Sequence, residues 1–328
     1  MMKLSARFFV MIVSLLLITQ LSANDFPTKP IELIVGFGKG GSTDRMTRIM
    51  QPFLAQIMDQ NINVTNIRGE GTQLSVEYFL KQPQNGYAML SSTFAPYMPN
   101  SIINGKANYA IEDFDFINLQ WFDYDLIAVH KTSKIDTLLT LLDAIQNSKK
   151  PLKVAVIYRS AGHLNLNLLL EKFHIKKQKL DYVFFESGQK ARDSLVKKKV
   201  DFLIISAQGS EVIRKDIRPL VVIKETRAKK WDAPTLNEAI ASTGISLPIL
   251  RGSMRGFAVS KIFKERYPER YAYLVAALKK TLAQKRVQRA LKIENIGYSW
   301  LGPEHSNALM REAFETFKSY NYLFDTQK

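Results

Sequence analysis

The sequence predicts an α/β protein made of two doubly wound domains, and three observations support this prediction. The chain has 328 residues, about two domains by the usual relation between length and domain number. Hydrophobic residues make up 46% of it, so it can bury a large core. Short apolar runs alternate with amphipathic stretches, which is typical of parallel sheets with helices on both faces.

The first 23 residues are predicted to be a signal peptide. Lys3 and Arg7 precede an apolar run over residues 8–19, which is short for a membrane span, and Ala23 offers a small residue at a plausible cleavage site. The alternative is an uncleaved N-terminal anchor helix. We expect the mature protein to begin near Asn24 and to be a soluble periplasmic protein of the Gram-negative type.

Beyond this segment, apolar runs predict strands and three-and-four-residue periodicity predicts helices. The strands are expected at residues 31–37, 62–67, 87–91, 154–158, 182–185, 202–206 and 220–223. The helices are expected at residues 46–57, 74–80, 135–145, 163–173, 189–196, 271–282 and 304–320. Pro52 lies inside the first helix and should kink it or leave a hydrogen bond unmade.

Two halves without a low-complexity linker indicate that the chain crosses between domains on extended strands. Residues 116–130 are apolar with few breakers, so we expect the first crossing there. The predicted domains are residues 24–125 together with 253–328, and residues 126–252.

The composition excludes several classes of function. The chain has no cysteine, which excludes disulfides, thiolate catalysis and cysteine-based metal sites. Its net charge of +16 would suggest nucleic acid as a partner. Export and the scattering of the lysines in short runs argue against that, so we expect no nucleic acid and a general field that favours anionic solutes.

Four predicted strand-to-helix turns have similar chemistry: residues 35–44, 66–72, 158–163 and 185–189. Each places glycines and hydroxyl side chains at a helix N-terminus, where free N–H groups and the helix dipole attract an anion. Ligands of α/β sheets bind at these carboxyl ends of the strands. Two turns come from each half, so the sequence predicts a site for a small anion between two domains. The alternative for any single turn is an ordinary capped connection.

Nucleotide binding and catalysis find little support. Gly36, Gly38 and Gly41 match dinucleotide spacing, but no acidic residue follows at the end of the next strand, and the Gly-Lys-Ser/Thr of a P-loop is missing. The four histidines lack metal-ligand spacing. Asp123 and Asp125 share a face of a predicted strand, with nothing beside them that suggests acid–base work. We expect no metal, no cofactor and no enzymatic activity.

Several segments resemble the Bug-type solute-binding receptors of tripartite tricarboxylate transporters. The most specific are residues 26–35 followed by Gly-Gly-Ser-Thr-Asp at 40–44, and Pro-Gln-Asn-Gly-Tyr-Ala-Met-Leu at 83–90. Further matches are Ser-Ala-Gly-His-Leu at 160–164, Val-Asp at 200–201, Arg-Pro-Leu at 218–220 and Ala-Pro-Thr-Leu-Asn-Glu-Ala at 233–239. They keep the family's order over nearly the whole mature chain.

The resemblance implies a type II periplasmic-binding-protein fold whose two domains close on a small organic carboxylate. It implies delivery of this ligand to integral-membrane permease subunits, by a receptor we expect to be a monomer. In the family, the turns matching 40–44 and 160–163 face the ligand from opposite domains. The candidate ligand-binding residues are Phe37, Gly40, Gly41, Ser42, Thr43, Asp44, Gly71, Thr72, Thr93, Ser160, Gly162, His163, Glu186 and Gly188.

Departures from the family pattern leave the ligand open. Lys39 stands where proline is common, and Glu70 puts an acid into the second turn. Asp44 or Glu70 could hold a ligand amine, as for an amino acid or an amide-bearing aromatic acid, or could face solvent. A ligand-sensing receptor that partners a membrane kinase is the alternative function, and an exported hydrolase is a third.

Overall fold

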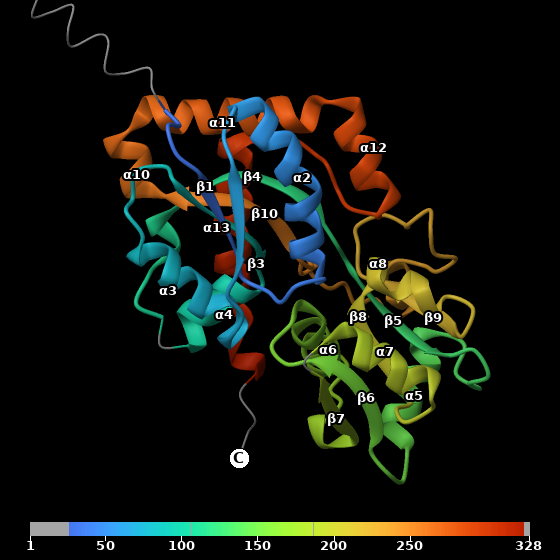
Figure 1. The fold of residues 1–328 in the computed structure, drawn as a ribbon. Coiled ribbons are helices and arrows are strands. Elements are labelled where there is room, and N and C mark those ends of the chain that lie inside the picture. The colour runs from blue at the N-terminus through green and yellow to red at the C-terminus, as the bar shows by residue number, and fades with distance from the viewer. Residues whose placement is uncertain (1–25, 106, 186, 325–328) are drawn as a thin grey trace, which may run out of the picture.

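The computed structural model describes residues 26–105, 107–185 and 187–324, which form two lobes, each built on a five-stranded sheet (Figure 1). The predicted signal peptide lies outside the described residues. No helix in the described part of the chain has the length and apolar character needed to cross a membrane.

The first lobe contains the sheet with strand order β2-β1-β3-β10-β4. β1 is parallel to β2 and β3, whereas β10 is antiparallel to both β3 and β4. The strand bounds are β1 Ile31–Val35, β2 Ile62–Asn66, β3 Ala88–Ala95, β4 Phe114–Phe122 and β10 Met254–Ser260.

The second lobe contains the sheet with strand order β7-β6-β8-β5-β9. β6 is parallel to β7 and β8, and β5 is antiparallel to β8 and β9. The strand bounds are β5 Asp125–His130, β6 Leu152–Ile157, β7 Leu180–Phe185, β8 Phe202–Ser206 and β9 Ile217–Val222.

Each sheet is therefore mixed, with one strand that runs against the parallel strands expected from the strand–helix alternation. The antiparallel strands are β5 and β10, and each is the first strand after the chain has crossed from the other lobe. β4 ends at Phe122 and β5 begins at Asp125, so the chain enters the second sheet at the edge that faces the first lobe. A strand that enters there must run against the parallel strands, which end at that edge. Strand-to-helix alternation does not reveal this reversal.

Helices cover both faces of each sheet (Figure 1). In the first lobe they are α2 Ser42–Met58, α3 Gln73–Lys81, α4 Tyr97–Asn104, α10 Lys261–Arg266, α11 Pro268–Ala283, α12 Lys285–Ile293 and α13 Gly302–Tyr320. In the second they are α5 Leu138–Asn147, α6 Ala161–Lys172, α7 Gly188–Val196, α8 Ala207–Ser210 and α9 Leu236–Ile240. α2 continues through Pro52.

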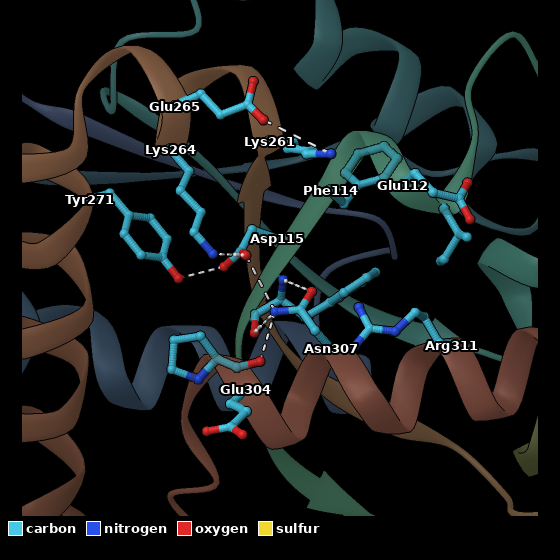
Figure 2. A pocket seen from close by; sticks show the side chains of 13 residues that line it. Glu112, Phe114, Asp115, Lys261, Lys264, Glu265, Tyr271, Glu304, Asn307 and Arg311 are labelled. Atoms are coloured by element: carbon cyan, nitrogen blue, oxygen red, sulfur yellow. Dashed lines mark hydrogen bonds and ion pairs between the residues drawn. The ribbon is translucent and has the colours of Figure 1, made fainter.

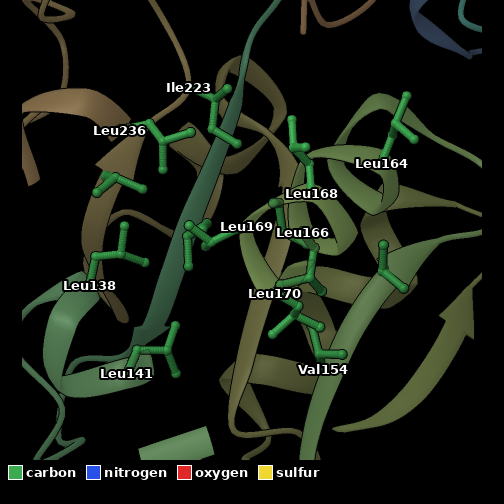
Figure 3. Close-up of a cluster of buried hydrophobic side chains, with 14 of the residues drawn as sticks. Leu138, Leu141, Val154, Leu164, Leu166, Leu168, Leu169, Leu170, Ile223 and Leu236 are labelled. Carbon is green, nitrogen blue, oxygen red and sulfur yellow. The ribbon is translucent and has the colours of Figure 1, made fainter. Parts of the chain in front are cut away.

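The core of the second lobe is centred on α6, whose residues 161–170 are all buried. A helix that is apolar on nearly every side needs neighbours all round it. Leu164, Leu168 and Leu169 pack in one buried cluster with residues of α5, β6 and α9 (Figure 3). The two asparagines of this helix donate outside it, Asn165 to the carbonyl of Leu250 and Asn167 to that of Leu323.

The C-terminal segment forms a further connection between the lobes. α13 packs against β4 of the first lobe, and the short turn Asn321–Phe324 follows it. Phe317, Leu323 and Phe324 belong to the same buried cluster as α6. The Leu323 carbonyl accepts from Asn167 Nδ2 at 2.8 Å and from Lys177 Nζ at 2.6 Å. The predicted domain 1 thus ends in contact with the second lobe, and the division at 125/126 and 252/253 stays a prediction.

We expect Gly256→Ala to destabilise the protein strongly. A Cβ on Gly256 would lie 1.9 Å from the backbone oxygen of Asn118, so β10 and β4 would have to separate. Forced overpacking costs about 1–3 kcal/mol and more where backbone must move. Urea unfolding measures the loss. Gly38→Ala is the matched control because a Cβ there meets no atom within 4 Å. Equal stability of the two variants would contradict the strand contact.

Candidate functional site

The four predicted turns lie at the edges of the two sheets that face each other. They connect β1 to α2, β2 to α3, β6 to α6 and β7 to α7, and parallel strands end at the same edge. Hydrogen bonds of side chains join the lobes at this level. Asn100 Nδ2 donates to the Arg159 carbonyl, and Trp121 Nε1 donates to Gln208 Oε1, both at 2.5 Å. We call this region the lobe junction.

Asp44 organises the first turn. Its Oδ2 accepts from the N–H of Gly40 at 2.8 Å, and its Oδ1 accepts from Arg48 Nε and Asn66 Nδ2. Burial opposes ionisation of this carboxyl, but these hydrogen bonds and the Arg48 charge hold its pKa below the usual value. Asn66 also donates to the Phe37 carbonyl. Asp44 therefore fixes the backbone of the turn, which supports a role in loop orientation, and direct contact with a ligand amine stays the alternative.

Hydroxyl groups gather behind the same turn. Thr43 and Thr93, both buried, share a hydrogen bond at 2.9 Å between their Oγ1 atoms. Thr47 Oγ1 lies 2.6 Å from Ser91 Oγ and donates to the Thr43 carbonyl. α2 begins at Ser42 after Gly41. The first N–H groups of α2 have no side-chain cap.

The second turn has a left-handed backbone at three consecutive residues. Glu70, Gly71 and Thr72 have φ values of 45°, 61° and 81°. Thr72 is buried but makes no capping bond to α3, whereas Glu70 is exposed.

Phe37 packs edge-to-face on Tyr97, with ring centroids 5.3 Å apart. Aromatic rings thus border the first two turns.

In the third turn, Ser160 caps α6 by accepting from the His163 N–H. Gly162 is closely packed, because a Cβ at this position would lie 2.9 Å from the Ile204 carbonyl and 3.4 Å from Asp125 Oδ2. His163 is buried against Tyr182, Phe184 and Phe324, and its Nδ1 accepts from the Arg159 N–H.

Burial and the charges of Lys177 and Arg159 lower the pKa of His163 to about 4. The imidazole is therefore neutral and packs inside the lobe. We therefore do not expect His163 to contact the ligand.

The fourth turn is described only in part. Glu186 lies outside the described residues. Ser187 caps α7 by accepting from the Lys190 N–H, and Gly188 adjoins the guanidinium of Arg192. Arg192 Nε is buried and has no hydrogen-bond partner among the described residues. The structure thus places a cation beside the predicted turn.

Sequence reasoning missed the most strongly charged part of the lobe junction. Arg255, at the start of β10, is buried with its guanidinium 4.3 Å above the ring of Trp121, and its Nε donates to Ser42 Oγ at 3.2 Å. Asp123 and Asp125 flank the first crossing and are also buried. For these two aspartates, the two-residue spacing in the sequence was the signal that could have indicated a shared location. For Arg255 the sequence alone offers none, because its role depends on where β10 enters the sheet.

Burial and mutual repulsion perturb both aspartates. Burial, followed by the negative charge of Asp123, raises the pKa of Asp125 to about 7. Burial also raises the pKa of Asp123, although Arg255 and hydrogen bonds from Ser206, Gln208 and Tyr124 oppose the shift. Burial thus raises the pKa of both carboxyl groups of this pair, and that of Asp125 is raised to about 7.

A separate pocket of about 660 Å³ lies on the first lobe, away from the four turns (Figure 2). Asp115 lies at its centre and accepts from Lys264 Nζ at 2.6 Å, from Tyr271 Oη at 2.5 Å and from Asn307 Nδ2 at 3.3 Å. These contacts join β4 to α10, α11 and α13. Since the Asp115 carboxylate is already fully engaged, we assign this pocket a structural role.

The chain is similar to four curated proteins, and no protein-family model matches it. A UPF0065 protein from the tcbD-tcbE intergenic region of Pseudomonas sp. strain P51 is 24% identical over 287 residues, 85% of this chain and 81% of that protein. Protein BugT of Bordetella pertussis is 30% identical over 158 residues, 47% of each chain.

Solved structures share the fold. A TctC solute-binding protein from Polaromonas has a TM-score of 0.72 and 25% identity, and the match covers 90% of this chain and 99% of that one. The R. palustris protein Rpa4515 with adipate has a TM-score of 0.73 at 20% identity, covering 92% and 98%. The two-lobed architecture is thus that of periplasmic binding proteins.

We expect Asp44→Asn to lower both stability and ligand affinity. An amide cannot accept all three hydrogen bonds of the carboxylate, and its NH₂ group would face a donor. Each lost bond to a charged group is worth about 1.5–3 kcal/mol. Thermal unfolding and calorimetry measure the two effects. A variant that melts normally but binds weakly would instead indicate direct contact between Asp44 and the ligand.

Asp125 should make the ligand-free protein less stable as the pH rises. Because the folded-state pKa is raised from 3.8 to about 7, the stability contribution is complete below pH 4 and is lost as the pH rises to about 7. Each pKa unit corresponds to about 1.4 kcal/mol. Asp125→Asn should flatten the dependence of melting temperature on pH between 4 and 8. An unchanged slope in calorimetric scans would refute the assignment.

Proposed function

We propose that this chain, a relative of the Bug-type solute-binding receptors, captures a small organic carboxylate between its two lobes and delivers it to a membrane permease. The observation that supports this best is the start of α2. Its first turn is buried at Thr43 and Asp44, has no side-chain cap and opens at the lobe junction. Uncapped N–H groups with the positive end of a helix dipole suit a carboxylate.

The contributions of the two lobes are complementary. The first lobe offers the α2 N-terminus and the Ser42 and Thr93 hydroxyls. The second offers the first N–H groups of α6, of which only that of His163 is capped by Ser160. Neither set can remove a small anion from water alone. Closure of the lobes would do so, and the two crossings between the sheets provide a natural hinge.

Location and partner follow from the same proposal. The predicted signal peptide and the similarity to solved periplasmic binding proteins support a receptor outside the cytoplasm. The adipate bound to the R. palustris protein supports a carboxylate ligand for this fold. The sensory alternative is not favoured by these comparisons. We infer a binding protein without enzymatic activity that acts with permease subunits.

The test begins with mass spectrometry of ligand released from purified protein, followed by calorimetry with that compound. Gly41→Val should reduce affinity at least tenfold, since its Cβ would lie 3.1 Å from the Gly38 carbonyl and its methyl groups would enter the turn. Small-angle scattering should show a smaller radius with ligand. Thr140→Ser, at the exposed start of α5, is the control. Normal binding by folded Gly41→Val would place the site elsewhere.

A further inference from the structure

The end of the second lobe that faces away from the lobe junction gathers lysines that lie far apart in the sequence. β6, β7 and β8 are parallel and end at the junction, so all three begin at this opposite end. β5 runs against β8, and β9 runs against β5, so β5 ends and β9 begins there as well. We name this end the lysine pole, and α5 lies beside it (Figure 1). It comprises residues 131–136, 149–153, 176–181, 197–201 and 215–218.

The lysine pole has a large excess of positive charge. Its five segments contain thirteen lysines and arginines against four aspartates. Lys131 pairs with Asp216 at 3.6 Å, whereas the other exposed lysines of the pole form no ion pair with any residue that the structure describes. Charges of one sign repel one another, and an anionic partner would relieve that repulsion. The exposed lysines are Lys131, Lys134, Lys149, Lys150, Lys153, Lys176, Lys197, Lys198, Lys199 and Lys215.

Contacts between the segments show that they form one surface. The N–H of Lys153, at the start of β6, donates to Asp201 Oδ2 beside the start of β8 at 2.7 Å. Burial, followed by the positive charges of Lys198 and Lys131, lowers the pKa of His130 at the end of β5. The segments next to β5, β6 and β8 thus place their charges side by side.

The chemistry of the lysine pole differs from that of a specific protein interface. Such interfaces are built around buried aromatic or arginine anchors. None of the large apolar side chains that are exposed in the described part of the chain lies in the five segments. Arg218 is the one arginine of the pole, and three backbone carbonyls of residues 131–136 accept from its guanidinium. The remaining cations are lysines, which are point charges on flexible stems and suit diffuse electrostatic attraction.

The breadth of the charged surface indicates the kind of partner. Adjacent strands lie about 4.8 Å apart, so five strand ends spread the lysines over roughly 20 Å. A layer of anionic headgroups can meet all five segments at once, and clusters of basic residues are attracted to such layers. We propose that the lysine pole docks onto a membrane surface rich in anionic phospholipids. This inference goes beyond the proposed function and does not depend on it, since the pole lies at the opposite end of the lobe from the candidate turns.

Vesicle flotation tests the inference with the purified protein. The vesicles consist of phosphatidylcholine alone or of equal parts of phosphatidylcholine and phosphatidylglycerol. At about 0.1 M salt we expect binding to the anionic vesicles to be at least tenfold stronger, and this preference should disappear at about 1 M salt, where the Debye length falls from about 10 Å to about 3 Å. Combining Lys150→Gln, Lys176→Gln and Lys197→Gln should weaken anionic binding at least tenfold, because each lysine near such a surface contributes about fivefold.

The matched control combines Lys279→Gln, Lys280→Gln and Lys285→Gln on the first lobe. These lysines are also exposed and form no ion pair with any described residue, so the control removes the same charge from another place. Circular dichroism establishes that both variants are folded, and the control should keep most of the anionic binding. Equal weakening in the two variants, or no preference for anionic vesicles, would overturn the inference. Tighter binding to polyglutamate or duplex DNA than to anionic vesicles would also overturn it, because the partner would then belong to another class.

Discussion

The reversal of one strand at each crossing is the constraint on which the rest of this structure depends. Because β5 and β10 both start at the lobe junction, they run against the strands they join. The parallel strands of both sheets consequently end at that junction, and the helices that follow them all begin there. The crossings thus bring four helix N-termini together and also bring Arg255 and Asp125, at the starts of the two reversed strands, into the same region.

Most of the elements could be predicted from the sequence because their cores are periodic. The run around α6 and the steps along α11 place apolar residues on faces that later prove buried. The direction of β5 and β10 could not be predicted in this way, since a strand has the same alternation in either direction. The direction of β5 and β10 within their sheets depends on where the previous strand ends, which is a property of the tertiary structure.

The residues of the candidate site also fall into a group that could be predicted from the sequence and a group that could not. Glycines and hydroxyls at the strand ends were visible because backbone geometry demands them locally. The roles of polar side chains were not, since they depend on distant partners. Asp44 is engaged by Asn66, 22 residues away, and Arg255 by Ser42, 213 residues away. His163 sat in a predicted turn, yet its ring belongs to an aromatic cluster that includes Phe324.

The contact between the chain's last described residues and the second lobe sets the order in which the protein can fold. The first lobe lacks the strand between β3 and β4 until β10 has been made, and the second lacks part of its core until Leu323 and Phe324 are present. Neither lobe can therefore complete itself while synthesis is under way, although contiguous domains commonly do so. Long loops must therefore close before these late segments can pack, and loop closure of this kind slows folding.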